Sequence, residues 1–196
     1  MKDSNFEVIT VDCDSKGAAA GQPFIDAANP RHPSLIDSEF VVAERYNTKN
    51  VPAAFWIDEA GRIVRANDPI YIQRRNRETG ESTINERYLE GLRDWIARGP
   101  ASAWATEPAE TSRRIGDAGG AHAQSLAHFR LGALLDAAGK HEASVQQFKR
   151  AQELRPENWN LKRQAWNLGD IEGDYATSMQ AEREKNPNYP PLEMPE

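Results

Sequence analysis

Cysteine is nearly absent from this chain of 196 residues, which contains one, Cys13. A single thiol cannot form an internal disulfide, a cysteine zinc cage or a Cys-x-x-Cys redox pair within the chain. The four histidines lie without tight ligand spacing, at His32, His122, His128 and His141. No Gly-x-Gly-x-x-Gly or phosphate-loop motif is present either. We therefore expect neither a metal nor a cofactor.

Long apolar runs and clusters of basic residues are also missing. No stretch approaches the roughly 18 consecutive apolar residues that a membrane span requires, and the first residues are polar, unlike a signal peptide. The 24 Lys and Arg are outnumbered by 30 Asp and Glu, for a net charge of −6. An acidic chain without a basic stripe is not expected to bind nucleic acid, because phosphate neutralisation needs clustered cations. We expect a cytoplasmic protein as the sequence stands, or an extracytoplasmic one if a signal or anchor precedes it.

Strand-like and helical segments alternate in the first half of the chain. The expected order is a strand at 6–12, a helix at 17–28, a short strand at 34–36, a helix at 38–46, a hairpin of strands at 53–57 and 62–65, and a polar loop at 66–82. The loop contains the run Arg74-Arg75-Asn76-Arg77, which is typical of a solvated segment. Such alternation is typical of α/β proteins, with helices packed on a sheet.

A capping box at Thr83-Ile84-Asn85-Glu86 predicts the start of the next helix, at 84–97. Its apolar stripe consists of Tyr88, Leu89, Leu92, Trp95 and Ile96, and Gly99-Pro100 ends it. Between 99 and 121 the residues Gly, Ala, Pro, Ser and Thr dominate, which predicts a linker. The expected organisation is a domain at 1–98, a linker at 99–121, a helical region at 122–185 and a Pro-rich tail at 186–196.

Residues 125–158 resemble one tetratricopeptide unit. The matching residues are Leu131, Gly132, Leu135, Gly139, Phe148, Ala151 and Pro156. In that family a small residue lets two antiparallel helices approach closely, and proline ends the second helix. Residues 159–185 predict two further helical segments that cap the repeat. A single repeat is more often a stabilising appendage or a dimer surface than a peptide receptor, because binding arrays usually have at least three repeats.

The stretch Val51-Pro52-Ala53-Ala54-Phe55-Trp56-Ile57, with the turn and strand that follow, resembles the cis-proline region of thioredoxin-like proteins. It is most similar to TlpA/ResA-type thiol–disulfide oxidoreductases and to the redoxins related to AhpC/TSA. The resemblance implies a thioredoxin-like α/β fold over about residues 5–97. It also implies a cis Val51-Pro52 bond, with Val51 and Pro52 binding substrate through the backbone of Val51 beside the redox site.

The nucleophilic cysteine of that family is missing. In members of the family this cysteine lies at the N-terminus of the first helix, where the helix dipole lowers the thiol pKa. The corresponding strand and helix would precede Phe6, and only five residues do so. Loss of this central strand would leave two unpaired sheet edges. We therefore expect a shortened chain, from a late start assignment or a fragmentary gene, rather than a minimal fold.

Cys13 is a poor replacement, because the neighbouring Asp12 and Asp14 are expected to raise its pKa. The implied family activity is thiol–disulfide exchange or peroxide reduction, with a protein or peptide thiol as partner, and this chain is expected to be inactive in it. Two alternatives stay open. One is a non-catalytic interaction module that uses the Pro52 face or the helical repeat, and the other is a redox sensor based on Cys13.

Overall fold

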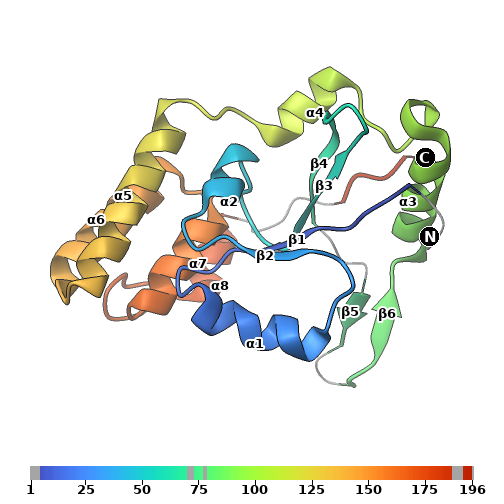
Figure 1. Cartoon of the computed structure of the whole chain (residues 1–196). Helices are drawn as coiled ribbons and strands as arrows, with labels where there is room; N and C mark the ends of the chain where they lie inside the picture. The colour runs from blue at the N-terminus through green and yellow to red at the C-terminus, as the bar shows by residue number, and fades with distance from the viewer. Residues whose placement is uncertain (1–4, 70–72, 77–78, 187–191, 196) are drawn as a thin grey trace. The chain divides into compact units, whose positions relative to one another are not determined.

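The computed structural model describes residues 5–69, 73–76, 79–186 and 192–195 (Figure 1). These residues divide into two compact units. The hairpin unit contains the described residues of the stretches 1–7, 52–115 and 190–196, and the helical unit contains those of 8–51 and 116–189. The expected domains follow one another along the chain, whereas each unit combines segments that are distant in sequence.

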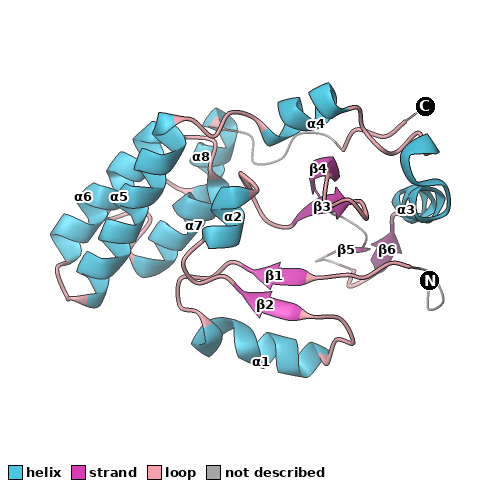
Figure 2. Cartoon of the chain, turned by 45° about the horizontal axis from the view of Figure 1, so that its top comes forward, coloured by secondary structure: helices cyan, strands magenta, loops and turns pink. Residues whose placement is uncertain are grey.

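A short parallel sheet lies in the helical unit. Strand β1 (Thr10–Asp12) pairs with β2 (Ser34–Ile36), and Thr10 lies opposite Ser34. Helix α1 (Ala18–Ala28) connects the strands and runs beside them (Figure 2). The helix at 17–28 and the strand at 34–36 are confirmed. The strand expected from residue 6 begins only at Thr10, because β2 offers three residues for pairing.

Helix α2 (Val41–Arg45) is shorter than the helix expected at 38–46. The carboxylate of Asp37 accepts hydrogen bonds from the backbone N–H groups of Val41, Val42 and Ala43 at 2.8, 2.9 and 3.0 Å. These groups are the donors that the first helical turn leaves unsatisfied. Asp37 therefore caps the helix from a position outside it and determines where the helix begins.

The helices of the C-terminal part are α5 (Gly120–Ala137), α6 (His141–Leu154), α7 (Trp159–Leu168) and α8 (Met179–Lys185). Helices α5 and α6 pack side by side and antiparallel, as both views show (Figures 1 and 2). Gly139, with a φ of 70°, lies in the turn between them, a conformation that favours glycine. The expected helix pair and the two further helices are confirmed, and α6 ends two residues before Pro156.

The core of the helical unit joins its two stretches of chain. Phe40 and Ala43 of the α2 region belong to the same buried cluster as residues of the C-terminal helices, namely Leu126, Phe129, Phe148, Ala151, Leu161 and Ala165. The segment after α2 is held by hydrogen bonds as well: Trp159 N–H donates to the carbonyl of Lys49 at 2.7 Å, and Asn160 Nδ2 donates to that of Thr48 at 2.9 Å. These contacts explain why residues 8–51 group with the helices.

The hairpin unit contains two antiparallel strand pairs. Strand β3 (Ala53–Ile57) pairs with β4 (Ile63–Pro69), and β5 (Gln73–Arg75) pairs with β6 (Ser82–Ile84). The hairpin is confirmed, but the polar loop expected at 66–82 is wrong, since it contains the end of β4 and strand β5. The preference of a residue for a strand depends on its neighbours in the sheet more than on its own type, so polar residues can also form strands. Arg77 of the expected solvated run lies outside the described residues.

Helix α3 (Glu86–Arg98) begins two residues later than the capping box predicts. Its N-cap is Asn85, whose side chain accepts a hydrogen bond from Tyr88 N–H at 3.1 Å. Thr83 is not the cap, because it lies in β6 and pairs with Arg74. The end of the helix at Gly99 is confirmed.

The stretch expected as a linker, 99–121, is partly helical. It contains the 3₁₀ turn η1 (Gly99–Ala101) and helix α4 (Pro108–Ile115). Proline suits the first helical position, and Glu110 forms ion pairs with Arg113 and Arg114 along α4, at 2.7 Å each. Among the described residues, no helix has the length and apolar character needed to cross a bilayer.

Candidate functional site

The only thiol lies directly after β1. Cys13 is partly buried against the core cluster of the helical unit. Its carbonyl accepts a hydrogen bond from Gln164 Nε2 at 3.3 Å, and the side-chain oxygen of Gln164 accepts from Ser15 N–H and Ser15 Oγ at 3.1 and 2.7 Å. Helix α7 thus holds the loop that carries the thiol.

Burial is the main reason why the pKa of Cys13 is raised to about 12, and the charges of Asp37 and Asp12 add to it. The prediction that Asp12 raises the pKa is confirmed. Asp37 was missed, and Asp14 instead accepts a hydrogen bond from Lys16 N–H at 2.8 Å. Because the Asp37 carboxylate occupies the N–H groups at the start of α2, that helix terminus is not available to stabilise a thiolate. Cys13 is therefore held as a neutral thiol at physiological pH.

Of the two expected substrate-binding residues, Val51 and Pro52, the first has both backbone polar groups engaged within the chain. Val51 N–H donates to Asn50 Oδ1 at 2.9 Å, and its carbonyl accepts from Arg163 Nη1 at 3.2 Å. Pro52 is exposed and has no N–H to offer. A substrate strand that paired with Val51 would have to displace these contacts, so the expected role of the two residues stays a prediction.

The tetratricopeptide-like residues divide into a packed set and an exposed set. Gly132 lies so close to the partner helix that an added Cβ would be 2.7 Å from Cδ1 of Phe148, which confirms the close approach expected there. Phe148 and Ala151 are each 1% exposed, whereas Leu131 is 45% exposed. Leu135 is half-buried and Pro156 is exposed. Together with Leu134, which is 70% exposed, Leu131 gives α5 an apolar outer side.

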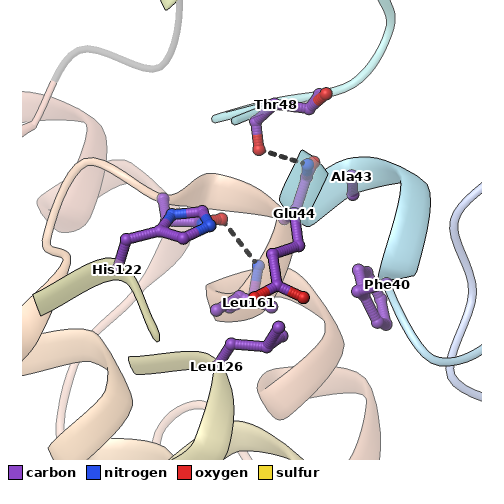
Figure 3. A pocket seen from close by; sticks show the side chains of 9 residues that line it. Phe40, Ala43, Glu44, Thr48, His122, Leu126 and Leu161 are labelled. Atoms are coloured by element: carbon purple, nitrogen blue, oxygen red, sulfur yellow. Dashed lines mark hydrogen bonds between the residues drawn. The ribbon is translucent and has the colours of Figure 1, made fainter. Parts of the chain in front are cut away.

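A small cavity lies between α2, α5 and α7 of the helical unit (Figure 3). Its volume is about 10 Å³, which suffices for one water molecule and for no organic substrate. His122 and Glu44 supply polar groups to its wall. Burial, followed by the positive charge of Arg155, lowers the pKa of His122. The cavity therefore has the character of a hydration site.

A network of buried polar side chains lies in the hairpin unit, and sequence reasoning missed it. Arg65 and Asp68 form an ion pair in which the side chains are 1% and 2% exposed. Tyr88 Oη donates to Asp68 Oδ2 at 3.3 Å and accepts from Trp56 Nε1 at 2.9 Å. Burial raises the pKa of Asp68, against the opposing effect of Arg65, and burial also raises the pKa of Tyr88. The phenol consequently stays neutral and serves as a hydrogen-bond relay.

The guanidinium of Arg65 lies within an aromatic cluster. This cluster consists of Trp56, Tyr88, Leu92, Trp95 and Trp104. The Cζ atom of Arg65 is 5.5 Å from the centroid of Trp56 and 5.3 Å from that of Trp104. Both distances are within the range of a cation–π interaction. The cluster thus surrounds a permanently charged group with apolar surface.

The C-terminal residues 192–195 lie against this network. Leu192 packs on the aromatic cluster, Arg65 Nη2 donates to the carbonyl of Glu193, and Arg87 Nη2 donates to that of Pro195. The Glu193 carboxylate pairs with Arg114 at 2.8 Å. Arg65 and Asp68 are close in sequence, three residues apart on β4. Arg65 and Glu193 are 128 residues apart, and no local pattern in the sequence predicts their contact.

No group of three or more His, Cys, Asp or Glu residues in the described part of the chain is arranged to hold a metal ion. Comparisons with protein-family models, with curated proteins and with solved structures find no match for this chain. The function has to be inferred from the two groups described above: the shielded thiol of the helical unit, and the arginine–aromatic network of the hairpin unit.

Proposed function

We propose that this chain is a redoxin-related protein with a thioredoxin-like fold that binds a protein partner and carries out no thiol chemistry through Cys13. The environment of Cys13 carries this proposal. With a pKa of about 12, the thiolate fraction at pH 7 is on the order of one in 100,000. Attack on a disulfide or a peroxide requires the thiolate.

The order of elements supports the redoxin-like part of the proposal. A parallel strand pair connected by α1 precedes the α2 helix and the β3–β4 hairpin, and the α3 helix follows after the additional β5–β6 pair. This is the order in which the resemblance places the inserted helix, the cis-proline hairpin and the closing helix. The strands of the described residues form three two-stranded sheets.

The test of the proposal is an assay of insulin reduction and of peroxide reduction by the full chain. Both activities should stay at background and be identical in wild type and Cys13→Ser, with a thioredoxin as positive control. Turnover by the wild type that the substitution abolishes would overturn the proposal. It would favour instead the thiol-sensor or catalytic interpretation of Cys13.

The binding part of the proposal is supported by the outer side of α5. Leu131 and Leu134 are one helical turn apart, and both of these large apolar side chains are exposed. We propose this surface as the contact through which the helical region forms a dimer. Sedimentation of the wild type should show a dimer at micromolar concentration, and Leu131→Glu/Leu134→Glu should be monomeric. A monomeric wild type at that concentration would contradict this role.

A further inference from the structure

Residues 192–195 contact the hairpin unit through two kinds of interaction. The first kind involves the backbone, because the carbonyls of Glu193 and Pro195 accept hydrogen bonds from Arg65 and Arg87. The second involves side chains, since Leu192 packs on the aromatic cluster and the Glu193 carboxylate pairs with Arg114. Backbone contacts at alternate residues combined with selective side-chain contacts are typical of peptide recognition.

One acceptor of the buried Arg65 guanidinium comes from the tail. Its donors reach the carboxylate of Asp68, the carbonyl of Trp104 at 3.2 Å and the carbonyl of Glu193. The first two acceptors belong to the body of the hairpin unit. The third belongs to the tail, which therefore supplies one of the three acceptors of this guanidinium. The unit thus presents a charged donor to a peptide carbonyl at this point.

The charges around the tail also require a partner. Three arginines, Arg65, Arg113 and Arg114, share two carboxylates of the unit itself, Asp68 and Glu110. The carboxylate of Glu193 neutralises the remaining positive charge. Arg114 is the stronger contact of this carboxylate, since its side chain is 13% exposed, against 62% for Arg113.

The tail also borders a depression in the surface of the hairpin unit. An open depression of about 320 Å³ is lined by Pro195, Trp104, Arg87, Glu90, Gly91, Asp94 and Ala103. Its wall combines the indole ring of Trp104 with charged side chains.

We propose that this arginine–aromatic surface is a binding site for an extended acidic segment of a partner protein. The recognised segment carries a glutamate or aspartate directly after a bulky apolar residue, as Leu192-Glu193 does. Residues 192–195 are the chain's own competing ligand for the site. The proposal rests on contacts within the hairpin unit and does not depend on the redoxin-like fold.

Binding of a fluorescein-labelled synthetic peptide of residues 187–196 to the full chain tests the proposal by anisotropy. Wild type should bind weakly, because its own tail competes. Glu193→Lys should weaken that competition and bind the peptide at least tenfold more tightly. Glu153→Lys, on the exposed side of α6, changes the net charge equally and should bind as the wild type does. Equal affinities of wild type and Glu193→Lys would overturn the proposal.

The receptor side is tested in a Glu193→Ala background, in which the chain's own tail carries no charge at this position that could pair with either residue at position 114. Adding Arg114→Glu should abolish binding of the wild-type peptide. The same variant should bind a peptide that carries Glu193→Lys. An unfolded variant would bind neither peptide. Arg150→Glu, at an exposed position of α6, should leave the affinity unchanged. If binding were lost and the peptide with Glu193→Lys did not restore it, Arg114 would not be part of the binding site. A wild-type dimer that Glu193→Lys dissociates would identify the tail of a second copy as the occupant and overturn the assignment to a partner protein.

Discussion

Arg65 and Asp68 lie three residues apart on β4 and form an ion pair from which water is almost wholly excluded. The pair connects the aromatic cluster, through Tyr88 and the two indole rings beside Arg65, with the site of the tail. Because the low local polarity makes an unpaired charge costly, each member of the pair depends on the other.

Replacing Asp68 by Asn should destabilise the protein strongly. The substitution leaves the Arg65 charge buried without its counter-ion, and such losses amount to about 3–5 kcal/mol. Urea denaturation followed by tryptophan fluorescence measures the free energy of unfolding. Glu153→Gln, which removes an exposed pair with Arg150, should cost less than about 1 kcal/mol. If the two variants lost similar amounts of unfolding free energy, the charge of Arg65 would not depend on Asp68 as its counter-ion.

Gly132→Ala should destabilise the α5–α6 pair. The added Cβ would lie 2.7 Å from the ring of Phe148, and overpacking of this kind costs about 1–3 kcal/mol, partly offset by the better helix propensity of alanine. Gly120→Ala on the same helix is the matched control, because a Cβ there meets nothing within 4 Å. In thermal or urea unfolding, Gly132→Ala should be clearly less stable than Gly120→Ala. The reverse order would argue against the close approach of the helices.

Asp37→Ala should have two effects that can be measured separately. Loss of the cap on α2 should lower the free energy of unfolding by about 1–2 kcal/mol. Removal of a negative charge near Cys13 should also raise the rate at which iodoacetamide modifies the folded protein, since Asp37 contributes to the high thiol pKa. The rate should stay below that of the unfolded chain, because burial is the larger cause. An unchanged rate would contradict the electrostatic role of Asp37.

His122 should make the protein less stable in mild acid. Its pKa in the folded protein is lowered, so the unfolded state, with a pKa of about 6.5, binds the proton more readily. Stability is then lost as the pH falls from about 6.5 toward the folded pKa, by up to about 1.4 kcal/mol per pH unit. His122→Gln should remove this part of the pH dependence between pH 7.5 and 5. Equal pH dependence in both proteins would exclude His122 as its source.

Local signals in the sequence predict local structure well in several places. The apolar run Ala53–Ile57 forms β3, the short run Ser34–Ile36 forms β2, and Gly99 ends α3. The segment 66–82 was misjudged because its strands contain polar residues and are defined by their partners, β3 for the end of β4 and β6 for β5. At the start of α3, Thr83 and Asn85 are both good N-caps, and the pairing of Thr83 in β6 decides between them.

Less of the candidate sites could be predicted, because they depend on contacts between distant segments. The influence of Asp12 on Cys13 was visible from their adjacency, whereas that of Asp37 depends on the β1–β2 pairing. The contact between Arg65 and Glu193 joins β4 to the C-terminal tail. No periodicity or composition signal marks an arginine that will be buried, so this network was accessible only in three dimensions.

The pH dependence of the rate at which iodoacetamide alkylates Cys13 in the folded chain tests the central claim most directly. The proposed absence of thiol chemistry rests on a thiol held neutral by burial and by two carboxylates. We expect the rate to rise without a plateau up to at least pH 10, in line with a pKa of about 12, and to be roughly fiftyfold slower at pH 8 than in the denatured chain. A plateau with a midpoint below about 8.5, the value of a free cysteine, would contradict the account.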